Sequence, residues 1–138
     1  MDKTTEQTKP RLDIPEMDAQ HDYLYILFER LCEPLSKNKM AGLLDEIAAY
    51  LDFHITSEEH LMRLYKAPEL AAHQSDHELA AQTLLRYIDD FERGEFNPGR
   101  LYKAMCGWLY EHTLDADMKY AEHIKEHRGS SNSTTENI

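Results

Sequence analysis

The stretch His54-Ile-Thr-Ser-Glu58, followed by His73-Gln-Ser-Asp-His77, twice places two strong metal ligands four residues apart. In an α-helix, residues i and i+4 lie on one face, one turn apart. Two such pairs on neighbouring helices would therefore direct four ligands into one space. Further candidates lie on either side, with His21 upstream and His112 and Asp117 downstream. The pattern predicts a helical bundle built around a shared cluster of histidines and carboxylates.

The composition favours one globular, all-α domain. A chain of 138 residues with 41% hydrophobic residues can form a core, and five Gly and five Pro are few for an all-β fold. The net charge of −11 argues against binding to nucleic acid or to an anionic membrane surface. No apolar run approaches the roughly 20 residues of a membrane span, and residues 1–10 lack the apolar segment of a signal peptide. We therefore expect a protein that neither binds nucleic acid nor inserts into a membrane.

The two cysteines, Cys32 and Cys106, are few for a chain of this size, which needs no covalent cross-link. We expect free thiols in a reducing compartment, the bacterial cytoplasm. A disulfide between them is the alternative.

Apolar residues recur at helical spacing in four segments. The expected helices run from Asp18 to about Leu35, from about Met40 to Lys66, from Pro68 to just before Gly94 and from Asn97 to Arg128. Asp18 and Asn97 are expected N-caps, and Pro68 should lie in a first turn, which tolerates proline. Gly94 suits the left-handed position past a helix end.

Four amphipathic helices with short connections predict an up-down-up-down antiparallel four-helix bundle. The expected organisation is a flexible N-terminal arm over residues 1–11 and the bundle over residues 12–128. Residues 129–138, which are rich in Ser, Asn and Thr, should form a disordered tail.

Seven ionisable residues lie within the four apolar stripes, and at least one is on each helix. They are His21, His54, Glu58, His73, His77, His112 and Asp117. A single histidine on an apolar stripe is more often a hydrogen-bonded core residue than a ligand. The alternative for the whole set is a buried hydrogen-bond network without an ion. That network would have to satisfy all seven side chains, and unpartnered buried carboxylates each cost several kcal/mol.

Five imidazoles and two carboxylates are more than one metal ion can use. Two octahedral ions would accept all five nitrogens, two bridging carboxylates and one solvent-derived bridge, and one coordination position would stay open. The set contains no thiolate, which disfavours a zinc-finger or iron–sulfur site. Imidazole and carboxylate ligands with an open position suit redox-active iron.

The spacing of His112 and Asp117 predicts an irregular helix. Residues five apart are separated by about 140° on an ideal α-helix, so only one of them would face the cluster. A π-bulge near residues 113–117 would bring both onto one face.

Four motifs resemble the hemerythrin family in its single-domain bacterial form, over roughly residues 12–122. They are Asp18-Ala-Gln-His21, His54-x-x-x-Glu58-Glu59, His73-x-x-x-His77, and Trp108-Leu-x-x-His112-x-x-x-x-Asp117-x-x-Tyr120. The resemblance implies a non-haem di-iron centre with an oxo or hydroxo bridge. It also implies His73, His77 and His112 on one iron, His21 and His54 on the other, and Glu58 and Asp117 as bridges.

The resemblance further implies a function. Dioxygen would bind reversibly, end-on, at the five-coordinate iron and be held as hydroperoxide in a dry pocket. The implied pocket residues are Leu24, Ile55, Trp108, Leu109 and Thr113. Ile55 replaces a usual aromatic residue, Thr113 replaces a usual aliphatic one, and a tryptophan often found in the N-terminal lead-in is missing; these departures concern oxygen affinity and lifetime rather than metal binding.

The expected function is oxygen storage, delivery or scavenging by a cytoplasmic monomer that binds dioxygen and small anions. An oxygen-consuming protein is the expected recipient. A sensor of oxygen, redox state or NO is one alternative, although such sensors usually carry an output domain. A di-iron oxidase, peroxidase or NO-handling enzyme is another, and would need a substrate pocket or a proton donor near the open iron.

Several other residues have competing interpretations. Tyr120 either donates a hydrogen bond to the ligand shell or simply packs. The hydroxyl of Thr113 either holds a water in the pocket or bonds to the carbonyl of Leu109, four residues earlier. His60 should be a surface residue, and His123 should complement a helix C-terminus.

Overall fold

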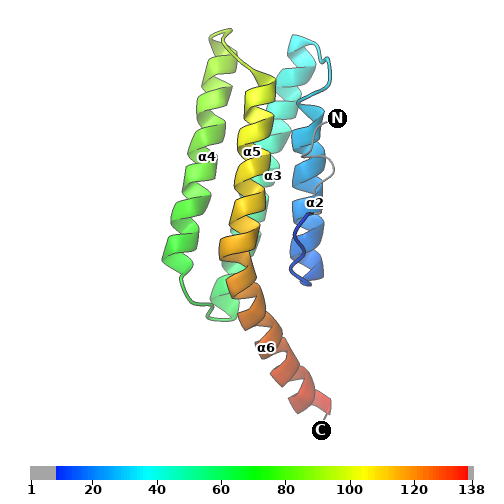
Figure 1. The fold of residues 1–138 in the computed structure, drawn as a ribbon, viewed down its shortest axis with the longest axis vertical. Helices are drawn as coiled ribbons and strands as arrows, with labels where there is room; N and C mark the ends of the chain where they lie inside the picture. Colours follow the sequence, from blue (N-terminus) through cyan, green and yellow to red (C-terminus); the bar gives the residue numbers. More distant parts are fainter. Residues whose placement is uncertain (1–8, 137–138) are drawn as a thin grey trace.

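The computed structural model describes the backbone of residues 9–136 and the side chains of residues 9–128. Its helices are α2 (Pro15–Arg30), α3 (Lys37–Leu64), α4 (Leu70–Glu92), α5 (Pro98–His112), the π-helical turn η1 (Thr113–Asp117) and α6 (Met118–Glu136). Because α5, η1 and α6 follow without a break, they form one rod, and the described chain has four rods and no strand. Successive rods lie side by side and run in opposite directions (Figure 1). This confirms the predicted four-helix bundle.

The start of α2 differs from the expected one. Pro15 is its first residue, and Ile14 before it provides no side-chain cap. Asp18, the expected N-cap, lies inside the helix, where its carboxylate accepts hydrogen bonds from the backbone N–H groups of Leu12 (2.8 Å) and Asp13 (3.1 Å). Proline suits the first position because its φ is already helical and its missing N–H has no partner there anyway. Asp18 instead connects the lead-in segment, residues 12–14, to the helix.

Two further helix starts are shifted along the chain. α3 begins earlier than expected, because the Ser36 hydroxyl accepts a hydrogen bond from the Lys39 N–H (3.3 Å) and caps the helix. α4 begins later than expected. Pro68 lies in the turn before it, and Glu69 adopts a left-handed φ of 64° that breaks the helical path.

Two predicted helix ends are confirmed. The Asn97 side chain accepts a hydrogen bond from the Arg100 N–H (3.1 Å), so it is the N-cap of α5. Gly94, just past α4, has a φ of 77°, which a side chain would disfavour.

The predicted N-terminal arm lies mostly outside the described residues, which begin at residue 9. Of the part that is described, Arg11 contacts α2 through an ion pair with Asp22 (2.6 Å). The end of the arm therefore lies against the bundle.

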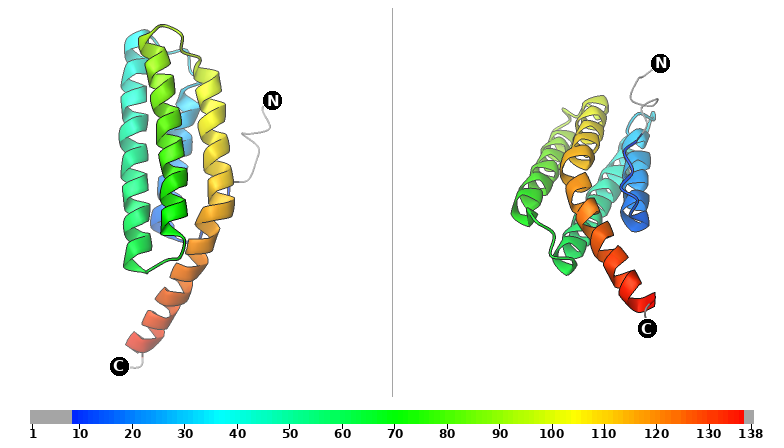
Figure 2. Two further views of the ribbon diagram at one scale, coloured as in Figure 1. Left: turned by 90° about the vertical axis from the view of Figure 1, so that its left-hand side faces the viewer. Right: turned by 60° about the horizontal axis from the view of Figure 1, so that its bottom comes forward.

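At the other end, the backbone of α6 is helical as far as Glu136, past the start of the tail predicted from residue 129. An existing helix can add residues without a new nucleation step, which explains how polar residues can continue it. Residues 137–138 lie outside the described part. Figure 2 shows α6 extending beyond the end of the bundle. No helix in the described part of the chain has the length and apolar character of a membrane span.

Two apolar clusters fill the molecule, and a polar layer separates them. Along α3, Leu51 belongs to the larger cluster and Leu61 to the smaller one, which also holds the lead-in segment and the start of α6. His54 and Glu58 lie between them and are fully buried. The same order recurs along the α5–η1–α6 rod. The fold thus places charged side chains between two dry regions.

Candidate metal centre

All seven predicted ligands lie in this polar layer, and none is more than 4% exposed. Every rod contributes at least one of them. They are His21 on α2, His54 and Glu58 on α3, His73 and His77 on α4, His112 on α5 and Asp117 on η1. The periodic pattern in the sequence therefore predicted correctly which side chains meet.

One oxygen of Glu58 faces three histidines. Glu58 Oε1 lies 2.7 Å from His73 Nε2, 2.8 Å from His77 Nε2 and 3.7 Å from His112 Nε2. We call His73, His77 and His112 the three-histidine group. These four residues offer ligand atoms close enough to bind a single metal ion.

The other oxygen of Glu58 faces the remaining two histidines. Glu58 Oε2 lies 3.8 Å from His21 Nε2 and 3.6 Å from His54 Nε2, and these two histidines form the two-histidine group. Asp117 divides in the same way, with Oδ1 2.9 Å from His73 Nε2 and Oδ2 3.4 Å from His21 Nε2. Each carboxylate thus presents one oxygen to each group of histidines, as a ligand that bridges two metals would.

The turn η1 allows His112 and Asp117, five residues apart in the last rod, to face the same way. Thr113–Asp117 is a π-helix, as the five-residue separation of His112 and Asp117 predicted. Its wider turn brings residues i and i+5 onto one face. Asp117 can therefore reach His112, with 3.1 Å between Oδ1 and Nε2.

Several atoms of the layer have no hydrogen-bond partner although they are buried. They are both ring nitrogens of His21, the Nε2 atom of His54 and both carboxylate oxygens of Asp117. Asp117 lies at ion-pair distance from histidines, but it accepts no hydrogen bond from them. Each buried polar group without a partner costs about 1–3 kcal/mol, and more if it is charged. Metal ions coordinated by these nitrogens and oxygens would remove that cost, so the residues present fit a metal centre.

The two buried carboxylates of the layer, Glu58 and Asp117, also need positive charge nearby to balance them. Burial lowers the pKa of three histidines, but their contacts with Asp117 and Glu58 outweigh it and raise the pKa to about 9 for His21 and His73 and about 10 for His112. Burial and Glu58 raise the pKa of Asp117, yet its close contacts with His112, His21 and His73 lower it to about 2. Protons on imidazoles thus balance the buried carboxylates when no metal is bound, and divalent metal ions can replace those protons.

Three of the histidines make a further hydrogen bond through their second ring nitrogen, which the sequence did not suggest. In each, the Nδ1–H group donates to a side-chain oxygen on the preceding rod. The pairs are His54 with Gln20 Oε1 (2.8 Å), His77 with Glu59 Oε2 (2.8 Å) and His112 with Asp76 Oδ2. Such partners fix the orientation of ligand imidazoles. The one available signal was that each acceptor is next to a predicted ligand in the chain.

Tyr120 supports the centre directly. Its hydroxyl donates a hydrogen bond to Glu58 Oε2 (2.8 Å), and its side chain is 1% exposed. Of the two interpretations of Tyr120, hydrogen bonding to a predicted ligand therefore holds.

The five side chains predicted to line an oxygen pocket are all at least partly buried. Leu24, Leu109 and Thr113 are buried, and Ile55 and Trp108 are partly buried against the larger cluster. The indole of Trp108 stacks on the imidazole of His112, with ring centroids 4.7 Å apart and planes 15° apart. Trp108 thus covers a predicted ligand with an apolar ring.

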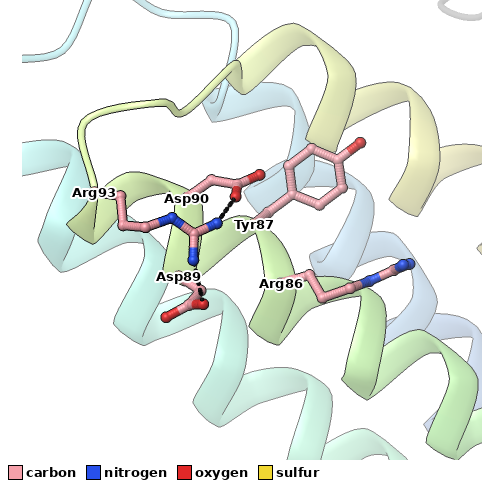
Figure 3. A pocket seen from close by; sticks show the side chains of 5 residues that line it. All are labelled: Arg86, Tyr87, Asp89, Asp90 and Arg93. Atoms are coloured by element: carbon pink, nitrogen blue, oxygen red, sulfur yellow. Dashed lines mark hydrogen bonds and ion pairs between the residues drawn. The ribbon is translucent and has the colours of Figure 1, made fainter.

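Other features lie away from the centre. His60 is exposed, as predicted. His123 Nε2 bonds to the carbonyl of Tyr65 (2.8 Å) at the end of α3, not to the end of its own helix, which continues to Glu136. A surface hollow of about 330 Å³ on α4 is lined by Arg86, Tyr87, Asp89, Asp90 and Arg93 (Figure 3). Within it, the Arg93 guanidinium donates to both neighbouring carboxylates (2.8 and 2.6 Å), so its charge is already balanced.

Comparisons with known proteins agree with this geometry. A family model described as the hemerythrin HHE cation binding domain matches residues 12–124. A bacteriohemerythrin from Stenotrophomonas maltophilia (strain R551-3) is 28% identical over 119 residues, which cover 84% of this chain and 78% of that protein. A bacteriohemerythrin from Aquifex aeolicus (strain VF5) is 26% identical over 115 residues, which cover 78% of this chain and 87% of that protein. No solved structure matches the chain significantly.

Proposed function

This chain belongs to the hemerythrin family, and we propose that it binds dioxygen reversibly at a non-haem di-iron centre, for oxygen storage, delivery or scavenging. The observation that carries the proposal is the division of the two carboxylates. Glu58 and Asp117 each present one oxygen to the three-histidine group and the other to the two-histidine group. A centre for a single metal would not need this arrangement.

In this proposal, the three-histidine group would hold one iron and the two-histidine group would hold the other. Glu58 and Asp117 would be shared by both groups. The two-histidine group offers one imidazole fewer, so dioxygen would bind on that side. The family resemblance and the mixed nitrogen and oxygen ligand set favour iron.

The two ferrous ions, when bound, supply the electrons that dioxygen takes up reversibly. The protein's own residues hold the ligands in place and keep solvent away. We infer that predicted pocket residues form an apolar wall there: Leu24 and Leu109 are fully buried, and the indole of Trp108 stacks on His112. An apolar wall of this kind slows the entry of water and anions that would displace dioxygen.

Carriage of oxygen is better supported than turnover of a substrate. The one hydroxyl among the predicted pocket residues, on Thr113, is bonded to the Leu109 carbonyl (2.6 Å). The carboxylates nearest the centre besides the ligands, Glu59 and Asp76, accept hydrogen bonds from ligand histidines. Neither is available as a proton donor to a bound substrate, so we propose that the protein is not primarily an enzyme.

We also propose that the protein acts as a monomer in the cytoplasm, with dioxygen and small anions as its ligands. Cys32 and Cys106, both in the described part of the chain, are not joined by a disulfide, as expected in a reducing compartment.

The test is to load the protein with Fe²⁺ without oxygen, measure iron per chain, and then record optical spectra as air is admitted and removed. We expect two irons per chain and a spectrum that changes with oxygen and returns when oxygen is removed. One metal ion per chain, or an immediate irreversible change, would contradict the proposal.

A further inference from the structure

Three side chains outside the ligand set form a regular series around the bundle. Each is adjacent in the chain to a predicted ligand, yet each accepts a hydrogen bond from a histidine on the next rod. The acceptors are next to His21, Glu58 and His77 in the chain. Their donors on the next rod are His54 for Gln20, His77 for Glu59 and His112 for Asp76. The series links α2 to α3, α3 to α4 and α4 to α5.

The charge of the acceptor differs between the two groups of histidines. In the three-histidine group, His77 and His112 donate to the carboxylates of Glu59 and Asp76. In the two-histidine group, His54 donates to the neutral amide of Gln20, and both ring nitrogens of His21 lack a hydrogen-bond partner. One metal position is therefore backed by two negative charges and the other by none.

The Glu59 carboxylate is itself held in place. Its Oε1 atom accepts a hydrogen bond from Gln74 Nε2 (3.1 Å) and lies 3.7 Å from the guanidinium of Arg63. Its Oε2 atom is left for His77, and its side chain is only 14% exposed. The orientation of His77 is therefore fixed before any metal arrives.

We propose that Glu59 and Asp76 are positioning residues that make the three-histidine position the tighter metal site, which fills first. A carboxylate that accepts the Nδ1–H bond raises the basicity of the imidazole and fixes its tautomer, so Nε2 binds a metal more strongly. Gln20 fixes a tautomer without adding charge. This inference rests on the proposed two-metal centre.

The experiment titrates the metal-free protein with Co²⁺ and follows it by proton NMR. Paramagnetic Co²⁺ shifts the Nδ1–H resonances of coordinated histidines far from the diamagnetic region, so each position has its own signature. We expect two binding steps. The first should give the shifted resonances of His77 and His112, and the second should add that of His54.

Charge-removing variants then test the cause. Glu59→Gln and Asp76→Asn keep an acceptor oxygen, and each should weaken the first step by about 10–100-fold while leaving the second nearly unchanged. Gln20→Glu should strengthen the second step instead. Asp45→Asn removes an exposed carboxylate on α3, away from the centre, and should change neither. Circular dichroism of each metal-free variant checks that it is folded, and Gln20→Glu provides a test by gain should the other two fold poorly.

The outcomes separate the inference from the proposed function. Binding of a single Co²⁺ would overturn the two-metal centre and the inference with it. Two Co²⁺ ions that bind with equal affinity, or that fill the position of His54 first, would overturn the inference alone. Equal effects of Asp76→Asn and Asp45→Asn on the first step would do the same, because general surface charge would then be the cause.

Discussion

The hydroxyl of Thr113 donates a hydrogen bond to the backbone carbonyl of Leu109, 2.6 Å away and four residues earlier. This contact decides between the two alternatives that the sequence left open. The hydroxyl is satisfied inside its own helix, so the side chain presents its methyl group to the predicted oxygen pocket. A water held by Thr113 is not supported by this geometry.

We therefore expect Thr113→Val to leave the decay of the oxygenated protein unchanged within about twofold, since the variant replaces a hydroxyl that is already bonded. The other alternative, a water held in the pocket by the Thr113 hydroxyl, would instead make the native protein decay faster than the variant. The measurement is the optical decay in air-saturated buffer, with the exposed Thr56→Val as control. A clearly slower decay in Thr113→Val would mean that the hydroxyl turns toward the pocket when oxygen is bound.

His77→Ala should lose metal and stability together. Glu58 Oε1 is 2.8 Å from His77 Nε2, so the variant removes a predicted metal ligand and one hydrogen-bond partner of a fully buried carboxylate. Losing a hydrogen bond to a charged group costs about 1.5–3 kcal/mol. Metal analysis and thermal unfolding measure the two effects, and His60→Ala, on the surface, is the control. Retention of both metals at an unchanged melting temperature would exclude His77 as a ligand.

Tyr120→Phe should destabilise the metal-free bundle by about 1.5–3 kcal/mol, the usual range for a hydrogen bond to a charged group. The lost bond joins the buried hydroxyl to Glu58 Oε2 (2.8 Å). Urea unfolding followed by circular dichroism measures the change. Tyr87→Phe, at a partly buried position that lines the surface hollow on α4, should have little effect. Equal losses in both variants would show that the Glu58 contact contributes nothing specific.

The metal-free protein should lose stability as the pH rises from about 7 to about 10. The pKa of His21 and His73 is raised to about 9, and that of His112 to about 10. Groups with a raised pKa stabilise the fold fully below the unfolded histidine pKa of about 6.5, and this stability disappears as the pH passes the folded value.

The metal-loaded protein should respond less, because its coordinated nitrogens carry no proton. Differential scanning calorimetry of both forms across this pH range tests the expectation. A melting temperature of the metal-free form that is constant or rises with pH would show that the histidines are not charged there.

The four rods, and the meeting of the seven candidate ligands, could be predicted from the sequence because both depend on helical periodicity. The place of a residue such as His54 on the buried stripe of α3 depends only on its spacing from other residues in the same helix. It does not depend on how the helices pack. The π-helix at Thr113–Asp117 was also predictable, because His112 and Asp117 cannot share a face of a regular α-helix.

Details that depend on contacts between rods could not be found in this way. Asp76 is one residue before a ligand, but its partner His112 lies on another rod, and only packing brings them together. Aspartate is a favoured N-cap residue, yet the helix begins at Pro15. The Asp18 carboxylate therefore accepts a hydrogen bond from the lead-in segment instead. Local propensity is a weak guide where proline or tertiary contacts compete with it.

The stacking of Trp108 on His112 gives the protein a built-in optical reporter. Trp108 is the one tryptophan in the chain, so all indole fluorescence comes from a ring in contact with a predicted metal ligand. A paramagnetic ion bound to His112 would quench the fluorescence of that ring, because only a few ångströms would separate them. Emission intensity would then report occupancy of the three-histidine position in real time, without any label and in the unmodified chain.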